Sequence, residues 1–167
     1  LVFLAPALLT NAAIQAAMDE TIFPTLHGFV WAKVFRGMQN TPLTGRQIAD
    51  GVVAAAMLRA IWTALTYYII MVIFGAIEVG RGLLSIPAAI FAGWAFGEVL
   101  LALAVHVEQD DGFFALINRF ILTPMFLFSG TFYPLAVLPI YLQWIGWISP
   151  LWHATELGRF LSYGHEM

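Results

Sequence analysis

Four long runs of apolar residues dominate the chain, and most charged residues fall between them. The runs cover residues 1–18, 52–77, 83–107 and 113–131, and the charged residues inside them are Arg59, Glu98 and Arg119. Each run approaches or exceeds the roughly 20 residues that an α-helix needs to cross a bilayer. None alternates between apolar and polar positions as a barrel strand does. The pattern predicts an all-α integral membrane protein, a polytopic helical bundle with about four spanning helices.

The residues between the first and second runs follow a different pattern. In residues 26–40, one helical face carries apolar side chains and the other carries polar ones, which predicts a short amphipathic helix on the surface. The alternative is a frayed end of the first span. The apolar face holds Val30, Trp31, Val34, Phe35 and Met38, and the polar face holds Lys33, Arg36 and Asn40.

The last part of the chain is divided by prolines. Pro134, Pro139 and Pro150 leave pieces too short to span, a length typical of re-entrant or interfacial helices. Aromatic residues with a polar edge are concentrated here, and such rings prefer the headgroup level of a membrane. They are Tyr133, Tyr141, Trp144, Trp147, Trp152 and Tyr163. We expect these pieces to enter the membrane surface and return.

Composition agrees with a membrane location and excludes several function classes. Hydrophobic residues make up 61% of the 167 positions and charged residues 10%, against about 25% charged in soluble domains. A net charge of -3 and a single lysine argue against nucleic acid as a partner. Without cysteine there is no disulfide, thiolate nucleophile or cysteine-bound metal. The chain begins at Leu1 without a basic leader, so we expect no signal peptide and a piece of a longer protein.

Basic residues predict the orientation, because Lys and Arg are retained on the cytoplasmic side. Lys33, Arg36 and Arg46 lie between the first two runs, whereas Arg81 stands alone between the second and third. The first connection is therefore expected in the cytoplasm. Alternation then places residues 78–82 outside, residues 108–111 inside, and the proline-divided tail with Arg159 outside.

Two charged residues within the spans are candidates for function, because charge inside a membrane is costly. Arg59 and Glu98 are expected at similar depths and could form a buried pair beside a transport path. In the alternative, Arg59 extends to the inner interface and Glu98 is protonated or bonded along its own helix.

An enzyme in its own right is not expected. His153 with Glu156, and His106 with Glu108, Asp110 and Asp111, fall on opposite faces of the predicted topology, so they cannot together supply the three ligands of a catalytic zinc. A phosphate-binding loop needs glycines followed by Gly-Lys-Ser/Thr, and Lys33 stands in no such sequence. An ion-driven transporter would need more intramembrane acids or helices broken at mid-depth.

Several segments resemble one known family. Residues 123–134 read TPMFLFSGTFYP, and Leu138-Pro139, Pro150-Leu151-Trp152-His153, Glu156 and Arg159 follow. Residues 3–6, which read FLAP, and residues 41–44, which read TPLT, add to the likeness. Together these segments resemble the type-2 ABC exporter permeases, whose members include nodulation-factor, polysaccharide and daunorubicin-type drug exporters.

The resemblance implies a permease subunit with six spans and both termini in the cytoplasm, of which this chain would supply the second to the fifth. Residues 25–40 would be a cytoplasmic coupling helix that docks on an ABC ATP-binding subunit, which binds ATP and magnesium; this chain would bind no cofactor. Residues 134–161 would form outer re-entrant helices around an external gate. The docking residues would be Val30, Trp31, Lys33, Val34, Phe35, Arg36 and Met38, and the gate motif Ser129, Gly130, Pro134, Pro139, Pro150, His153, Glu156 and Arg159.

The resemblance further implies a multi-pass protein of the plasma or inner membrane that works with a second permease copy. The cargo would be amphipathic or lipid-linked: a drug, a lipid or a glycan. A fragment of an ion-driven secondary transporter is the alternative.

Overall fold

The computed structural model describes residues 3–38, 40–77, 80, 82–106 and 112–163. Every regular element in these ranges is helical, which confirms the all-α prediction. The helices are α1 (Leu4–Leu26), α2 (Val34–Met38), α3 (Gly45–Ile73), α4 (Ser85–Ala104), α5 (Phe113–Ile117), α6 (Thr123–Phe128), α7 (Ile140–Ile148) and α8 (Pro150–Tyr163). Two π-helical turns, His27–Trp31 and Asn118–Leu122, and two 3-10 turns, Gly82–Leu84 and Leu135–Val137, complete the set.

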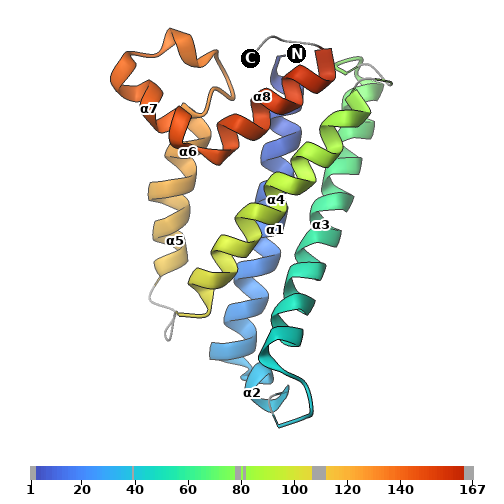
Figure 1. Ribbon diagram of the computed structural model, residues 1–167, viewed down its shortest axis with the longest axis vertical. Coiled ribbons are helices and arrows are strands. Elements are labelled where there is room, and N and C mark those ends of the chain that lie inside the picture. The colour runs from blue at the N-terminus through green and yellow to red at the C-terminus, as the bar shows by residue number, and fades with distance from the viewer. Residues whose placement is uncertain (1–2, 39, 78–79, 81, 107–111, 164–167) are drawn as a thin grey trace.

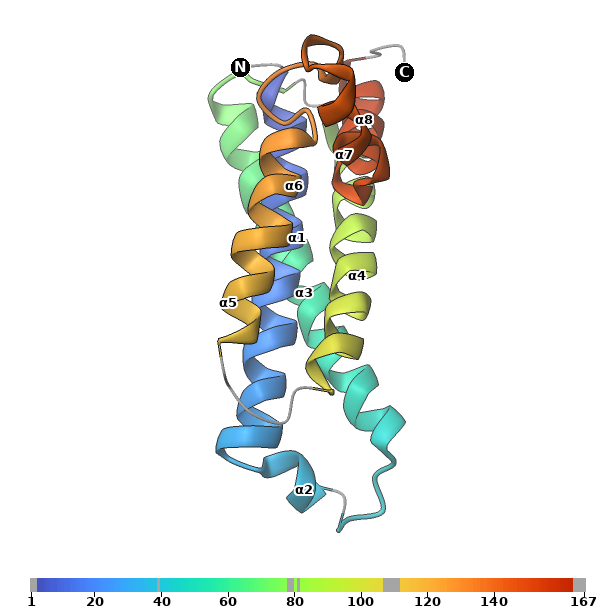
Figure 2. The same cartoon turned by 90° about the vertical axis from the view of Figure 1, so that its left-hand side faces the viewer.

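The long helices lie side by side along one axis (Figure 1). We call the end that carries the chain termini, α7 and α8 the upper end, and the end that carries α2 the lower end. Helix α8 crosses α1 and α4 at the upper end, and α5 and α6 form a column beside α1 (Figure 2). The proline-divided tail therefore lies at the end opposite α2, as the predicted topology requires.

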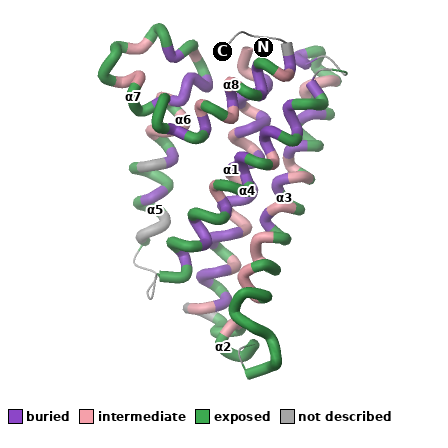
Figure 3. The backbone as a smooth tube through the Cα atoms, in the orientation of Figure 1, coloured by how far each residue is buried: buried purple, intermediate pink, exposed green. Residues whose placement is uncertain are grey.

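Helix α1 is the centre of the bundle. Most of its residues are buried, among them Leu9, Ala13, Ile14 and Met18 (Figure 3). Helix α4 approaches it closely through Gly93, where a Cβ would come within 3.1 Å of the Ala13 carbonyl oxygen. Small residues permit such contact between membrane helices. Helix α1 continues to Leu26, eight residues beyond the expected end of the first span at residue 18.

Helix α3 packs along a single narrow line and leaves most of its surface open. Its buried residues are Ala56, Ala60, Ala64 and Tyr68, each four positions after the last. Large apolar side chains cover the rest, and Trp62 and Ile73 are 73% and 75% exposed. A continuous apolar surface of this size is not stable against water, so α3 fits a lipid environment.

Two helical stretches within the described residues are long and apolar enough to cross a membrane, Gly45–Ile73 and Gly82–Ala104. Helix α1 is long enough, but Asn11, Gln15, Asp19 and Glu20 lower its mean hydropathy. The run from Phe113 to Phe128 is helical throughout, with a π turn in the middle. The first and fourth predicted spans, residues 1–18 and 113–131, stay predictions.

The π turn in that run has a local cause. Pro124 has no N–H to donate to the carbonyl four residues earlier, and the Thr123 N–H donates to the Asn118 carbonyl, one residue further back than in an α-helix. The Thr123 hydroxyl donates to the same oxygen at 3.0 Å. The hydrogen-bond ladder thus changes register just before the proline.

The single helix predicted for residues 25–40 is not present. Helix α1 and the turn His27–Trp31 take up the first half, as in the alternative interpretation, and the chain then breaks at Lys33, whose φ is 54°. The reversal lets the Phe35 ring pack on Gly28, where a Cβ would overlap it, and edge-on against Phe29 at 4.9 Å between ring centres. We call residues 27–38 the elbow.

Helix α3 begins seven residues before the run predicted from 52. Thr44 caps it: its side chain accepts from the Gln47 N–H at 3.3 Å, and the Gln47 side chain accepts from the Thr44 N–H at 2.8 Å. This reciprocal arrangement is a capping box, which stabilises a helix start. The polar first turns of α3 therefore extend the helix below the apolar part.

Candidate functional site

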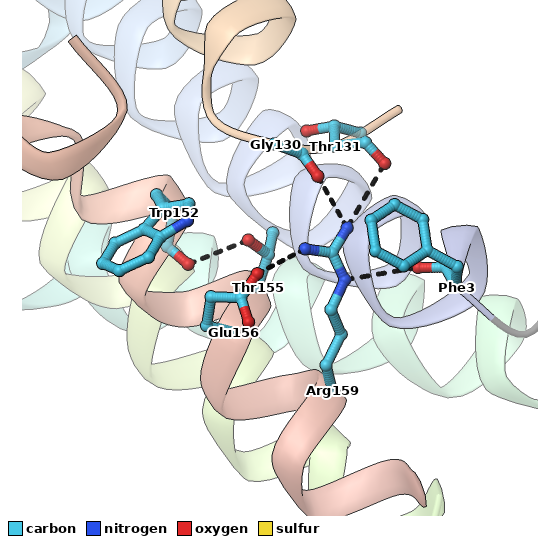
Figure 4. A network of polar contacts seen from close by, with 7 residues as sticks. All are labelled: Phe3, Gly130, Thr131, Trp152, Thr155, Glu156 and Arg159. Atoms are coloured by element: carbon cyan, nitrogen blue, oxygen red, sulfur yellow. Dashed lines mark hydrogen bonds and ion pairs between the residues drawn. The ribbon is translucent and has the colours of Figure 1, made fainter. Parts of the chain in front are cut away.

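The upper end contains a buried polar cluster around Arg159 of α8 (Figure 4). The Arg159 side chain is fully buried and pairs through Nη1 with the Glu156 carboxylate at 2.5 Å. Its Nη2 donates to the carbonyl oxygens of Gly130 at 2.6 Å and Thr131 at 3.4 Å, and its Nε donates to the Phe3 carbonyl at 3.4 Å. The guanidinium also lies 3.7 Å from the centre of the Phe3 ring.

These contacts explain how a charge can be buried here. A buried ion is strongly unfavourable unless it is both paired and hydrogen-bonded, and each nitrogen of this guanidinium has an acceptor. The acceptors come from α8, from the loop after α6 and from the start of α1. Arg159 therefore joins three segments that are far apart in the sequence.

The loop after α6 is shaped to present its carbonyls to Arg159. Gly130 has a φ of 71°, in the region that favours glycine, and packs against Trp152. Ser129 is fully buried; its hydroxyl donates to the Met125 carbonyl and lies 2.8 Å from the Ser149 hydroxyl at the end of α7. The Thr131 hydroxyl is buried, without a hydrogen-bond partner among the described residues.

The remaining residues of the predicted gate motif lie around this cluster. Pro134 comes directly before the turn Leu135–Val137, and Pro139 comes directly before α7. Pro150 is the first residue of α8, a position whose N–H has no partner within the helix, so that its absence does not weaken the helix. His153 is exposed, and its Nε2 donates to the Trp147 carbonyl at 3.0 Å. The structure thus brings Ser129, Gly130, Glu156 and Arg159 together and leaves His153 outside.

The His and acid constellations do not form a metal site in the part of the chain that the structure describes. Glu156 is taken by Arg159, and His106 contacts the Ala102 carbonyl at 2.7 Å through Nδ1. Within the described ranges, no three His, Asp or Glu side chains come close enough to hold a metal ion. Glu108, Asp110 and Asp111 lie outside those ranges.

The lower end presents the elbow. Lys33, Val34, Arg36 and Met38 are exposed, whereas Phe35 is half-buried and points back at Gly28. Phe35 is thus less exposed than its neighbours on the elbow, and its role in docking stays a prediction. A hollow of about 420 Å³ separates the elbow from the first turns of α3. The side chains of Val30 and Trp31 lie outside the described part of the molecule.

The two intramembrane charges do not meet. Arg59 Nη1 bonds to the Glu20 carboxylate of α1 at 2.7 Å. Glu98 instead accepts from the Trp94 indole, one turn earlier on α4, at 3.0 Å. Glu98 is thus bonded along its own helix, as in the alternative interpretation. Arg59 pairs with Glu20 and not with Glu98.

Sequence reasoning missed two partners and one cavity. Phe3 was noticed only as part of a motif, and Glu20 only as the end of a span. A hollow of about 210 Å³ between α1 and the α5–α6 column is lined by polar side chains in otherwise apolar helices, including Asn11, Gln15, Asn118 and Thr123. The four-residue spacing of Asn11 and Gln15, which puts both on one helical face, was an available signal.

Comparison with known proteins agrees with these features. Residues 7–162 match the ABC-2 type transporter family. The chain is 29% identical to Nodulation protein J of Rhizobium leguminosarum bv. viciae over 165 residues, which is 99% of this chain and 63% of that protein. Nodulation protein J of Sinorhizobium fredii (strain NBRC 101917 / NGR234) is 26% identical over 157 residues, 94% of this chain and 60% of its own length.

The chain thus spans about three fifths of the length of the curated relatives it matches. No solved structure is significantly similar to it. The family match covers α1 to α8 nearly completely, including the elbow and all of the Arg159 cluster except Phe3. On this ground the chain is a helical membrane protein that belongs to the ABC-2 type transporter family.

Proposed function

We propose that this chain is the membrane-embedded part of the permease subunit of an ATP-binding-cassette exporter. The observation that carries the proposal is the match to the ABC-2 type transporter family across residues 7–162. The exposed apolar surface of α3 and the separation of the elbow from the Arg159 cluster, at opposite ends of the molecule, support it.

In this proposal α1, α3, α4 and the α5–α6 column are the second to fifth spans of a six-span subunit in the plasma or inner membrane. Lys33, Arg36 and Arg46 lie at the lower end, and Lys and Arg are retained in the cytoplasm. The lower end is therefore the cytoplasmic one, and α7 and α8 lie on the outer side.

The elbow is proposed as the coupling element. Its exposed side chains, Lys33, Val34, Arg36 and Met38, combine two apolar groups with two charges, a mixture that suits a protein groove with an acidic rim. Val30 and Trp31 belong to the same proposed surface. ATP and magnesium would be bound by the partner subunit.

The Arg159 cluster, with residues 134–161 around it, is proposed as the outer gate region. A gate needs a part that moves and a part that stays fixed. Arg159 connects α8 to the start of α1 through the Phe3 carbonyl, and to the loop after α6 through the carbonyls of Gly130 and Thr131. Ser129, Gly130, Pro134, Pro139, Pro150, His153 and Glu156 would shape the loops around it.

The transport path is proposed along the polar hollow between α1 and the α5–α6 column. Polar side chains inside a membrane usually face a water-filled cavity or a substrate, and carboxamides hydrogen-bond well to hydroxyl-bearing cargo. The hollow is only partly enclosed by this chain. A second copy of the permease would therefore complete the path for an amphipathic or lipid-linked substrate.

Co-purification tests the proposal. The full-length gene product, extracted in mild detergent, should retain an ATP-binding subunit in fixed ratio, and the complex should hydrolyse ATP. The double substitution Val34→Asp and Met38→Asp should release that subunit, because both side chains are exposed on the elbow. Arg46→Gln, on an exposed side chain of α3 nearby, is the matched control and should leave the complex intact.

A permease that transports its cargo without any ATP-binding subunit would contradict the proposal and favour an ion-driven secondary transporter. Release of the subunit by Arg46→Gln but not by the double substitution would move the docking surface from the elbow to α3.

A further inference from the structure

The pair Arg59–Glu20 lies in a groove between α1 and α3, on the outside of the bundle. Arg59 is 58% exposed, unlike the buried Arg159, and its bond to Glu20 uses only Nη1. The described residues accept no hydrogen bond from its other N–H groups, although a guanidinium has five donors. Arg59 therefore keeps donors that face the groove.

Two hollows meet at this ion pair. One, of about 690 Å³, runs along α3 and is lined by apolar groups such as Leu58, Ile61 and Trp62. The other, of about 660 Å³, lies along α1 and includes the carboxylate of Asp19. Both contain Glu20 and Arg59. The groove is therefore amphipathic: the hollow along α3 is mainly apolar, the hollow along α1 carries charged side chains, and the two meet at the Arg59 guanidinium.

The distance of the groove from the polar start of α3 suits the boundary between headgroups and hydrocarbon. Arg46 and Asp50 occupy the first turns of α3, and Arg59 lies roughly 14 Å beyond Asp50 along the helix. Side chains on a helix lean toward its N-terminus, so the guanidinium is displaced back toward the lower membrane surface. An arginine at this level commonly reaches the phosphates.

The charges in the groove select among lipids. Asp19 and Glu20 bring two negative charges and Arg59 one positive charge, so an anionic headgroup is disfavoured. A headgroup with both a phosphate and an ammonium group fits: the free N–H groups of Arg59 suit the phosphate, and the two carboxylates suit the ammonium.

We propose that the groove binds a phospholipid of the phosphatidylethanolamine class at the lower leaflet, with its phosphate on Arg59, its ammonium at Asp19 and Glu20, and an acyl chain along Leu58, Ile61 and Trp62. The inference rests on the membrane location of the chain and does not need the exporter function. The primary ammonium can donate hydrogen bonds to the carboxylates, which a choline headgroup cannot do.

Native mass spectrometry of the delipidated full-length protein tests this binding without any ATPase. It should be titrated with phosphatidylethanolamine, phosphatidylglycerol and phosphatidylcholine carrying identical acyl chains. We expect phosphatidylethanolamine to bind about tenfold more tightly than either other lipid. Soluble phosphoethanolamine at millimolar concentration should not displace it, because the headgroup alone lacks the apolar contacts.

Variants locate the site. The double substitution Arg59→Gln and Glu20→Gln removes the ion pair without leaving one charge unpaired, and should abolish the preference. Asp19→Asn, which breaks no bond among the described residues, should reduce the preference over phosphatidylglycerol. Arg46→Gln, an exposed arginine on the same helix with an acid one turn away, is the control and should bind like the unsubstituted protein.

An unchanged preference in the double variant would overturn the proposal. So would a full-length protein that prefers phosphatidylglycerol, or one that binds no lipid through Arg59 because another segment of the chain covers the groove. Displacement by soluble phosphoethanolamine would point to a small-molecule site in place of a lipid site.

Discussion

At the scale of single residues, the surroundings of Arg159 explain how a charged side chain can be fully buried in this protein. Its guanidinium has no contact with water and is held by one carboxylate, three backbone carbonyls and an aromatic ring. Lysine cannot make the same set of bonds, since it has neither the planar shape nor the number of donors.

Arg159→Gln should destabilise the purified protein by about 3–5 kcal/mol, the usual cost of removing one partner of a buried ion pair. Arg159→Lys should recover only part of this loss. Thermal unfolding in detergent measures both. Arg46→Gln, whose side chain is 90% exposed, should change stability by no more than about 0.5 kcal/mol. Equal stability of all three variants would show that the cluster does not hold the upper end together.

The sequence predicted part of this site. Arg159, Glu156, Gly130 and Ser129 stood out through a family resemblance, and the structure places them together. Phe3 lies 156 positions from Arg159, and besides its ring it contributes a backbone carbonyl that any residue would offer. A contact of that kind leaves no pattern in a sequence, so only the fold could show it.

At the scale of elements, the elbow differs most from the helix predicted from the sequence. Periodicity in residues 26–40 agreed with one amphipathic helix, but Phe35 belongs to the inner surface. The close contact of its ring with Gly28 requires a reversal at Lys33. A period of 3.6 residues is informative only where the backbone keeps one helical register.

Gly28→Ala tests this element directly. A Cβ at Gly28 would overlap the Phe35 ring, so α2 should detach from α1, and ATPase association should weaken at least tenfold if the elbow is the docking element. Gly37→Ala is the matched control, because a Cβ there meets nothing within 4 Å. Co-purification yield against the ATP-binding subunit measures both variants. Equal yields for the two would show that Phe35 packing is irrelevant to docking.

Helix boundaries were predictable where a local signal exists. The four residues from Thr44 to Gln47 form a capping box, a signal that places the start of α3 well before its apolar run. The end of α1 had no such signal. Asp19 and Glu20 indicated an aqueous boundary, but Glu20 lies inside the helix, where it pairs with Arg59, a residue that is 39 positions away.

At the scale of the whole molecule, the two ends differ in character. Basic residues lie near α2, whereas aromatic residues lie near α7. The charge distribution predicted this separation, and the structure keeps the two groups at opposite ends. The number of membrane crossings was harder to predict from the sequence, because polar residues interrupt α1 and the α5–α6 column. Packing against neighbouring helices makes these polar residues tolerable.

Cysteine labelling tests the orientation, and the absence of cysteine from these 167 residues makes it direct. In a full-length background without other cysteines, Val137→Cys in intact cells should react with a membrane-impermeant maleimide, because Val137 is 74% exposed at the upper end. Asn40→Cys at the lower end should react only after the membrane is permeabilised. The reverse pattern would invert the topology and remove the elbow from the cytoplasm.

The central position of α1 has a consequence for how the protein is made. The ribosome synthesises α1 before α3, α4 and α8, the helices that surround it. Alone in lipid, its Asn11 and Gln15 would face hydrocarbon, which disfavours insertion. We therefore expect α1 to enter the bilayer stably only once later helices emerge from the translocon and shield it. In nascent chains that end before α4, α1 would then be able to leave the bilayer again.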